Sequence, residues 1–350
     1  MLTFCTLLDS NYIDKGLVLH HSMEQVMPDF KLYILAMDEK CYEILKSMQL
    51  KHTRIISLAE FEDEELTRIR KERSRAEYCW TCSANLIDYV FETYQEPYCT
   101  YIDSDLYFYK NPVVLIEEMI RYNCSVQIVE HGFGSGHRAR RQLQNSGRFC
   151  VQFNTFKNDL HGRAILGTWK DQCRAHCSMD TNEMGDQKYL SEWPEKYEKV
   201  HVLQNQGGGV APWNLFRFKK SAKSKGLLVD KKSKEEFELI FYHFHHLEYI
   251  DDTHVNMNVF KKGIGVDKSL AMEIYLPYLK ALEQMKKTLK EEYHFVPMIK
   301  SHPGFVKRTK KEKLMAFRNT KGKDLLYRIQ EKIIYTQGKK RDILDLNSII

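Results

Sequence analysis

Two aspartates that directly follow an apolar run are the strongest candidates for chemistry in this sequence. The run Tyr98–Ile102 leads into Asp103-Ser104-Asp105, so two carboxylates stand one residue apart. If the run is a strand of a parallel sheet, its carboxyl end borders the crevice where such sheets bind ligands. Two carboxylates there suit a hard divalent cation, which takes oxygen ligands and keeps positions open for phosphate oxygens. We therefore predict a metal site at this point, although the same pattern also occurs in ordinary loops.

A second group of candidate ligands lies in the run Phe241–His246, where three histidines fall within four residues. Histidines are unusual in so apolar a run, and the alternative interpretation of each one is a core histidine with a hydrogen-bond partner. Manganese accepts both carboxylate and imidazole ligands. We therefore predict a mixed site for Mn²⁺ or Mg²⁺ formed by Asp103, Asp105 and His243.

Three other segments combine residues that serve either binding or structure. Met184–Leu190 places Asp186 near an expected helix start, where it either serves a site or caps the helix. The glycine-rich basic segment His131–Gly147 is either a loop that closes over a diphosphate or an anionic acceptor, or a mobile surface loop. Gly207–Gly209 is an expected loop, and Trp213 beyond it either stacks on a sugar or belongs to the core.

The elements that must position these residues alternate between strand-like and helix-like segments. In the first half we expect strands at Thr3–Leu8, Lys31–Met37, Arg54–Leu58, Tyr98–Ile102 and Ser125–Glu130, and helices at Leu17–Met27, Glu60–Arg73 and Ala84–Tyr94. The less regular second half has expected strands at Val151–Phe156 and Leu239–Phe244, and expected helices at Arg163–Cys173 and Ser269–Leu289. Such alternation is typical of an α/β fold with a mainly parallel sheet covered on both faces.

Positive charge is concentrated near the C-terminus. The formal net charge of the 350 residues is +6, yet Lys300–Asp342 alone holds 14 lysines and arginines against 4 acidic residues. Such a segment favours an anionic partner. An amphipathic helix there either lies on an anionic membrane surface or packs its apolar stripe on the domain; its expected apolar positions are Leu325, Leu326, Ile329, Ile333 and Ile334.

Nothing in the sequence indicates a secretory signal or a membrane-spanning run, so we expect a cytoplasmic protein, with peripheral contact at the inner face of the membrane as one option. Nine cysteines are then expected to be reduced. Cys79 and Cys82 form one Cys-x-x-Cys pair, but no second pair or paired histidines follow at the spacing of a structural zinc site.

Five short motifs, in order over roughly residues 1–250, resemble those of glycosyltransferase family 8. This family includes glycogenin and the bacterial lipopolysaccharide galactosyltransferases. The matching pieces are Leu8–Tyr12, Tyr101–Asp105, Gln152–Thr155, Gly185–Gln187 and His243-Phe244. The resemblance implies a GT-A fold with a mainly parallel central sheet flanked by helices, a uridine diphosphate sugar as donor, manganese, and retention of configuration. We expect a catalytic domain at residues 1–265, and we expect residues 266–350 to be a helical, basic extension.

The same resemblance implies roles for individual residues. It implies catalytic roles for Asp186 and Gln187 beside the donor sugar, and it makes His243 the third metal ligand. The implied donor-binding residues are Thr6, Leu8, Asp9, Asn11, Tyr12, Arg75, Asp103, Ser104 and Asn154.

Two departures from the family pattern leave positions open. No Lys-Pro-Trp follows His243-Phe244, so the lysine that would touch the diphosphate is unassigned. Tyr78-Cys79-Trp80 stands where the family has Tyr-x-Arg, so the arginine that contacts the donor is Arg73, Arg75 or absent.

The sequence thus predicts a metal-dependent glycosyltransferase that moves a hexose-type sugar to a glycan, a lipid-linked acceptor or another surface polysaccharide. One alternative is a nucleotidyltransferase, which also combines an α/β sheet, carboxylates and a metal but would need a lysine-rich nucleotide loop where Asp9–Lys15 stands. Another alternative is a nucleic-acid-binding protein that acts through its basic segment, in which case binding should weaken steeply with salt.

Overall fold

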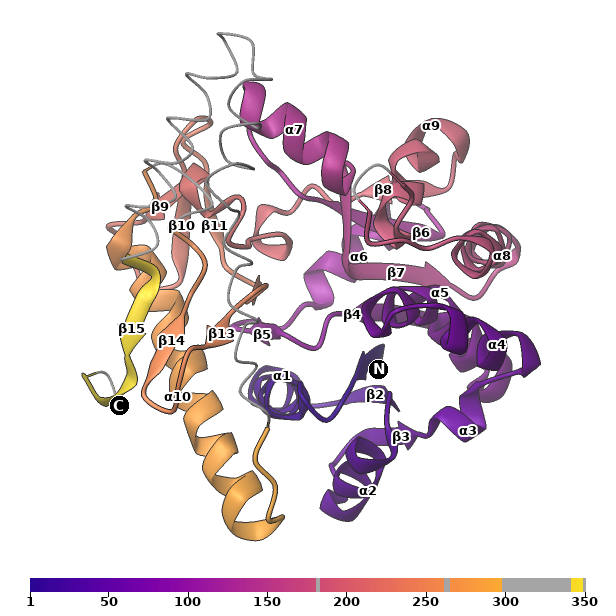
Figure 1. Cartoon of the computed structure of the whole chain (residues 1–350). Coiled ribbons are helices and arrows are strands. Elements are labelled where there is room, and N and C mark those ends of the chain that lie inside the picture. Colours follow the sequence, from indigo (N-terminus) through magenta and orange to yellow (C-terminus); the bar gives the residue numbers. More distant parts are fainter. Residues whose placement is uncertain (181–182, 261–264, 298–340, 349–350) are drawn as a thin grey trace, which may run out of the picture.

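The computed structural model describes residues 1–180, 183–260, 265–297 and 341–348, and a seven-stranded sheet lies at its centre (Figure 1). The strands run in the order β3-β2-β1-β4-β7-β6-β8. Their bounds are Leu2–Leu8 (β1), Phe30–Ala36 (β2), Thr53–Ile56 (β3), Tyr98–Ile102 (β4), Val126–Glu130 (β6), Phe149–Lys157 (β7) and Val200–Val202 (β8). β1 to β4 are mutually parallel where they pair, β8 is parallel to β6, and β7 runs antiparallel to both neighbours. The predicted mainly parallel sheet is confirmed.

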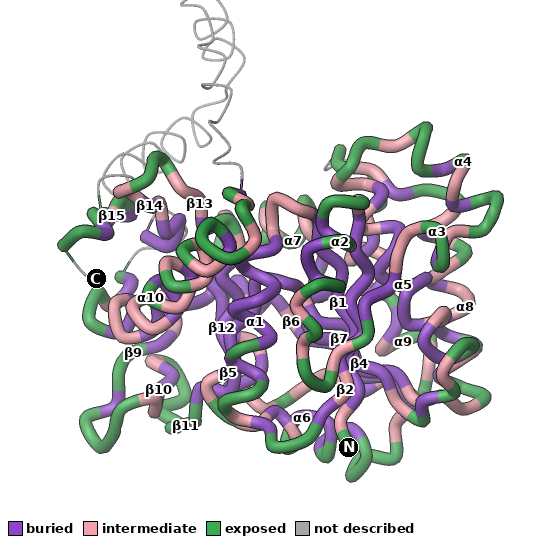
Figure 2. The backbone as a smooth tube through the Cα atoms, turned by 90° about the horizontal axis from the view of Figure 1, so that it is seen from below, coloured by how far each residue is buried: buried purple, intermediate pink, exposed green. Residues whose placement is uncertain are grey.

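Helices cover both faces of this sheet, because successive side chains of a strand point to opposite sides. Cys5 and Leu7 of β1 share a buried cluster with α5 (Arg75–Tyr94) and α8 (Leu160–Ala175). Phe4 and Leu8 share another with residues of the helices on the opposite face, which are α1 (Ile13–Val26), α2 (Glu39–Met48) and α6 (Val113–Arg121). In Figure 2 the central strands β1, β4 and β7 are accordingly buried along most of their length. The predicted α/β fold class is confirmed.

The charged segment predicted as one helix, Glu60–Arg73, forms two helices, so that prediction was wrong. These are α3 (Leu58–Phe61) and α4 (Glu64–Glu72). The backbone between them is extended at Asp63, whose side chain accepts a hydrogen bond from the amide of Leu66 and so starts a new helix. An N-cap aspartate satisfies an amide that has no partner within the helix, which is why the chain breaks here.

Two other expectations changed at helix boundaries. α5 begins well before the predicted Ala84, because Ser74 and Glu77 form a capping box at its start. The segment His131–Gly147, expected to be a loop, contains helix α7 (His137–Ser146). Both differences reflect local hydrogen bonding that hydrophobic periodicity does not report.

The remaining elements form three small sheets and several helices beside the main sheet. β5 (Leu106–Phe108) pairs with β12 (Phe241–His243); β9 (Phe218–Lys220), β10 (Leu227–Asp230) and β11 (Glu236–Glu238) form a second sheet; β13 (Glu248–Tyr249), β14 (His254–Asn256) and β15 (Ile343–Asp345) form a third. The other helices are α9 (Trp193–Lys196), α10 (Lys268–Glu292) and the 3₁₀ helices Asp186–Glu192, Gln206–Gly208, Leu215–Arg217 and Leu346–Ser348.

A third buried cluster joins α10 to other segments in the second half of the chain. Residues of α10, including Tyr275 and Tyr278, share it with Val210, Phe244 and Val255, and α10 also packs against α1. The predicted domain boundary at residue 265 therefore falls between segments that share a core. The apolar stripe predicted within residues 325–334 lies outside the described residues. None of the described helices combines the length and the apolar character needed to cross a membrane.

Candidate active site

Two short antiparallel strands bring the predicted metal ligands together. β5 begins directly after the two aspartates, and β12 pairs with it so that His243 lies opposite Leu106. The amide of Phe244 donates to the carbonyl of Asp105 (2.9 Å), and the amide of His243 donates to the carbonyl of Val210 (3.1 Å). Backbone hydrogen bonds on both sides of β12 therefore fix where the His243 side chain starts.

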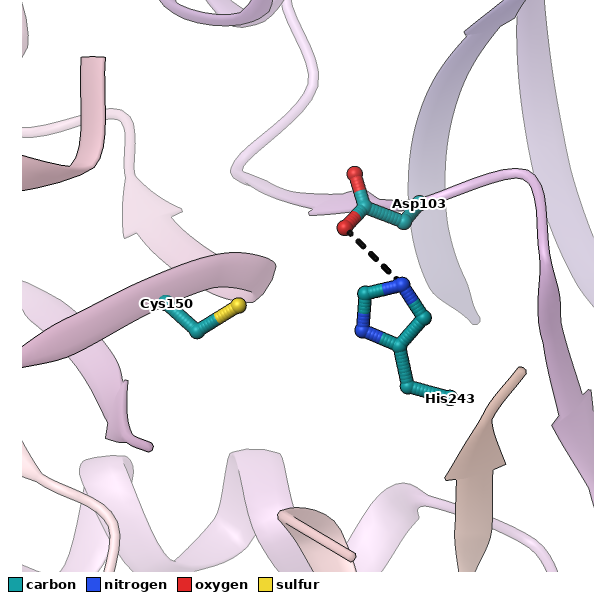
Figure 3. A group of neighbouring side chains, drawn as sticks. All are labelled: Asp103, Cys150 and His243. Atoms are coloured by element: carbon teal, nitrogen blue, oxygen red, sulfur yellow. Dashed lines mark ion pairs between the residues drawn. The ribbon is translucent and has the colours of Figure 1, made fainter. Parts of the chain in front are cut away.

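The imidazole of His243 is directed at both aspartates. Its Nε2 lies 2.9 Å from Oδ1 of Asp105 and 3.6 Å from Oδ2 of Asp103 (Figure 3). Its Nδ1 lies 2.7 Å from Oε1 of Gln152. Because that oxygen only accepts, Nδ1 carries the hydrogen, and Nε2 is the nitrogen that faces the carboxylates. A carbonyl partner on the far nitrogen is the usual arrangement of a metal-ligating histidine, so these residues fit a divalent ion.

Electrostatic coupling within this group is strong because His243 and Asp105 are buried and Asp103 is half-buried beside them. Burial raises the pKa of Asp103 to about 6, with the Asp105 charge adding to the shift and His243 opposing it. Burial would also raise the pKa of Asp105, but the charge and hydrogen bond of His243, together with the Lys15 ammonium, hold it well below its usual range. Burial would lower the pKa of His243, but the Asp105 carboxylate raises it well above its usual range. The two carboxylates therefore lie where a cation is favoured.

Two more side chains bring potential ligand atoms to the same place. The thiol of Cys150, at the start of β7, groups with Asp103 and His243, with all ligand atoms within 4.8 Å of one another (Figure 3). Within the same limit, the imidazole of His245 groups with Asp105 and His243. The sequence interpretation included neither Cys150 nor His245 among the ligands.

The end of β1 carries a second polar cluster, at the residues predicted to bind the donor. Nε of Arg75 lies 2.6 Å from Oδ2 of Asp9, and its NH2 lies 2.5 Å from Asp38. Asp9 also accepts a hydrogen bond from the amide of Asn11 (2.8 Å). Arg73, the other arginine considered, instead donates to the carbonyls of Cys173 and Arg174. Of these two arginines, Arg75 is therefore the one joined to the loop after β1.

Lys15 connects this loop to the metal-ligand group. Its Nζ lies 4.1 Å from the ring centre of Tyr12 and donates to the carbonyl of Leu247 (3.2 Å). The lysine is buried, and its positive charge helps to lower the pKa of Asp105. Sequence reasoning missed Lys15, because the only local signal is that it follows Tyr12, the residue just before α1, by three positions.

The other predicted donor-binding residues are buried around the same strands. Thr6 and Leu8 lie in β1, and among the described residues Oγ1 of Thr6 has no hydrogen-bond partner. Ser104 is buried in the turn between β4 and β5. Asn154 pairs with Tyr101 deeper in the sheet. In the orientation that satisfies its side-chain amide, that amide donates to main-chain carbonyls of its own strand.

Asp186 begins a 3₁₀ helix and is buried, while Gln187 is half-buried. One carboxylate oxygen of Asp186 accepts a hydrogen bond from the amide of Gln187 (2.7 Å), and its main-chain carbonyl accepts one from Nε1 of Trp169 (3.0 Å). Burial raises the pKa of Asp186 to about 7, and the negative charge of Asp103 contributes to the shift. The structure therefore places a carboxyl that titrates near neutral pH within electrostatic reach of the metal-ligand group.

A cavity of about 610 Å³ lies beside the glycine-rich segment. Its lining includes Phe133, Phe216 and Leu143 with two arginines, each of which is paired to an acid: Arg148 with Glu130 and Arg217 with Asp230. Trp213 does not line it.

The indole of Trp213 is buried against the histidines, and its Nε1 donates to the carbonyl of His131 (2.8 Å). The core interpretation of this tryptophan is therefore the correct one.

No family model matches the chain. Two proteins of Bacillus subtilis (strain 168) are similar in sequence, and both are described as uncharacterized. YfnD is 29% identical over 286 residues, covering 80% of this chain and 88% of its own. YfnF is 28% identical over 298 residues, covering 83% and 96%.

Solved structures also match the chain. An active-site mutant of LgtC has a TM-score of 0.48 at 12% identity, over 84% of this chain and 99% of that one. LgtC in complex with donor and acceptor sugar analogs, described as a galactosyltransferase, has a TM-score of 0.43 at 12% identity, over 70% and 87%. Apo mouse xyloside xylosyltransferase 1 has a TM-score of 0.45 at 13% identity, over 70% and 98%. These similar structures are glycosyltransferases, the class that the ordered motifs predict.

Proposed function

We propose that this chain is a metal-dependent glycosyltransferase that takes a hexose-type sugar from a nucleotide diphosphate donor, with uridine diphosphate (UDP) as the nucleotide. The observation that carries the proposal is the convergence of Asp103, Asp105 and His243, with Nε2 of the imidazole facing both carboxylates. These residues come from segments far apart in the sequence, and Gln152 fixes the tautomer that a metal requires. The order of the five motifs along the chain supports the same class of enzyme.

Asp103, Asp105 and His243 are the proposed ligands of Mn²⁺ or Mg²⁺. When bound, such an ion neutralises the negative charge that develops on a departing nucleoside diphosphate. Lys15 supplies a further positive charge beside Asp105. We assign to it the role of the diphosphate-contacting lysine, which the motif comparison leaves unassigned. Its support is its burial beside Tyr12 and its charge interaction with Asp105.

Around the ion, the end of β1 is the proposed donor-binding region. Arg75 and Asp9 form an ion pair there, and Asn11 and Tyr12 continue the loop into α1. Thr6, Leu8, Ser104 and Asn154 complete the proposed set on the strength of the motif resemblance.

Asp186 and Gln187 are the proposed catalytic residues beside the donor sugar. A buried carboxyl whose pKa is about 7 is ionised in part at neutral pH, so it can orient a sugar hydroxyl or stabilise positive charge on the ring. Retention of configuration, with the leaving phosphate helping to deprotonate the acceptor hydroxyl, is supported by the family resemblance. We name no covalent nucleophile, and Asp186 is the candidate to test for that role.

The proposed acceptor is a glycan, a lipid-linked glycan or another surface polysaccharide. We further propose a cytoplasmic location in which the basic segment Lys300–Asp342 contacts an anionic membrane at its inner face or an anionic acceptor; its 14 basic residues against 4 acidic ones support this. Residues 1–265 are the proposed catalytic domain, and residues 266–350 are the proposed helical, basic extension that contacts these partners.

The test is calorimetric titration of UDP into the full chain, with and without Mn²⁺. Wild type should bind UDP only when Mn²⁺ is present, and Asp105→Asn should weaken that binding by about 100-fold or more, because the ion loses a charged ligand. Asp29→Asn, which removes an exposed carboxylate just before the amino end of β2, opposite to the strand ends that carry the site, is the matched control and should bind as wild type does.

Manganese-dependent binding that survives Asp105→Asn unchanged would contradict the proposed ligand set. Failure of the wild type to bind uridine, guanosine and thymidine diphosphates with Mn²⁺ would contradict the transferase proposal itself. Manganese-dependent binding of UDP would justify a screen of sugar donors. In that screen, Asp186→Asn should lose transferase activity.

A further inference from the structure

Two imidazoles, not one, lie beside the aspartates of the candidate metal site. The ligand atoms of Asp105, His243 and His245 lie within 4.8 Å of one another, as do those of Asp103, Cys150 and His243. His243 belongs to both groups, so it links them into one larger set of candidate metal ligands. His245 is half-buried, and its electrostatic interaction with Asp105 helps to lower the pKa of that carboxyl.

The position of His245 is set by its neighbours. The ring of Trp213 makes edge contacts with the rings of both His243 and His245, each at 5.3 Å between centres. The indole is itself held by the hydrogen bond from its Nε1 to His131. The two imidazoles also contact each other edge to face at 5.3 Å. Both rings therefore pack against one anchored aromatic side chain.

The backbone makes a tight turn just after His245. The amide of Leu247 donates to the carbonyl of Phe244 (3.0 Å), and His246 has a φ of 61° in the left-handed region. His246 is exposed, in contrast to His245, and its ring contacts that of His245 edge to face at 4.0 Å between centres. Of the two histidines beyond β12, His245 is the one that the turn leaves beside the carboxylates.

We propose that His245 is a protein ligand of the metal ion in the enzyme without bound donor. This inference rests on the proposed metal site and adds one imidazole to its ligands. Before a nucleotide is bound, Asp103, Asp105, His243 and His245 then hold the ion as a set of two carboxylates and two imidazoles.

Such a set has a consequence for the choice of metal. Imidazole is a poor ligand for Mg²⁺ and a good one for first-row transition ions, whose affinity for nitrogen sites rises from Mn²⁺ to Co²⁺. The second imidazole therefore favours a transition ion over Mg²⁺ in the donor-free protein, and it favours Co²⁺ over Mn²⁺.

The experiment is titration of Mn²⁺ and of Co²⁺ into nucleotide-free full-length protein, followed by calorimetry. The variants are His245→Asn and the matched control His246→Asn, which removes the adjacent, exposed imidazole; a thermal melt of each verifies folding. We expect His245→Asn to weaken Co²⁺ binding about tenfold or more, to weaken Mn²⁺ binding less, and His246→Asn to change neither by more than about twofold.

Equal affinities of wild type and His245→Asn would overturn the inference and leave the proposed three-ligand site intact. Equal losses for both ions would also overturn it, because general loosening of the site does not discriminate between metals. If the wild type binds neither ion, the proposed metal site fails together with the inference.

Discussion

At the scale of single residues, burial controls how Asp186 titrates. An exposed aspartate has a pKa near 3.8, and burial raises that of Asp186 to about 7. Between these two values the folded protein binds a proton that the unfolded chain releases. Folding stability attributable to Asp186 is therefore fully present below about pH 4 and is lost as the pH rises towards 7.

Asp186→Asn should remove this dependence. The amide keeps an oxygen that can accept from the amide of Gln187, and it carries no charge at any pH. We expect the variant to be more stable than wild type by about 2–4 kcal/mol at pH 8, and equal to it within about 0.5 kcal/mol at pH 4. Urea unfolding of both proteins at the two pH values, with chelator present, measures the difference.

A stability difference that is the same at pH 4 and pH 8 would show that Asp186 titrates normally. Asp252→Asn, which changes an exposed carboxyl, serves as the control and should show no difference at either pH.

Residue types and their order were enough to predict the three side chains that converge at the candidate metal site. Asp103, Asp105 and His243 were all identified in this way, because a strand end and a histidine-rich apolar run are local signals. Gln152 and Lys15 were not recognised, because their importance depends on distances to His243 and Asp105 that only the folded chain defines. The sequence offered one weak signal for Gln152: residues two apart in a strand lie on the same face, which places it beside Cys150 in β7.

At the scale of elements, the position of β12 depends on the glycine turn that precedes it. The carbonyl of Gly207 accepts from the amide of Ile240 (3.0 Å), and that of Val210 accepts from His243 (3.1 Å). A Cβ added to Gly207 would lie 2.1 Å from the carbonyl oxygen of Glu238, so the backbone would have to move.

Gly207→Ala should therefore destabilise the protein by about 2–3 kcal/mol and weaken Mn²⁺ binding, because it displaces the strand that carries His243. Gly209→Ala is the matched control, because its Cβ would meet a side-chain methyl of Val129 at 3.2 Å and the carbonyl oxygen of Glu130 at 3.9 Å, and it should cost about 1 kcal/mol or less. Urea unfolding and metal titration of both variants test this. Equal effects of the two alanines would mean that the turn does not position β12.

The strands of the main sheet other than β8 were easier to predict than helix boundaries, whereas β5, β9 to β11 and β13 to β15 were not predicted. β4 was predicted with its observed bounds, Tyr98–Ile102, because an apolar run between polar residues has few other interpretations. The break at Asp63 and the start of α5 at Ser74 depend on side-chain caps, and α7 has too few apolar residues for its periodicity to be seen. The pairing of β5 with β12 was beyond sequence reasoning, because nothing local specifies a contact over so long a separation.

At the scale of the whole molecule, the last described residues stabilise the third core cluster. β15 pairs with β14, and the buried Asp342 accepts hydrogen bonds from the amides of Val259 and Phe260, each at 2.7 Å. These amides are themselves buried with the cluster, so they need an acceptor.

Asp342→Ala should lower the free energy of unfolding by about 2–3 kcal/mol, because two buried amides lose their acceptor. Asp345→Ala removes an exposed carboxylate three residues further on and should change stability by no more than about 0.5–1 kcal/mol. Urea unfolding of the two variants makes the comparison. A matching stability for both would place the C-terminal strand outside the cooperative unit.

The pairing of β5 with β12 also has a consequence for biosynthesis. A chain is made from its N-terminus, and domains generally fold as they emerge. The two aspartates leave the ribosome long before His243 and the strand that carries it, and Asp342 follows later still. A nascent chain that ends between Asp105 and His243 therefore carries only two of the three predicted metal ligands. The three predicted metal ligands can therefore lie together only after β12 has been made and has paired with β5.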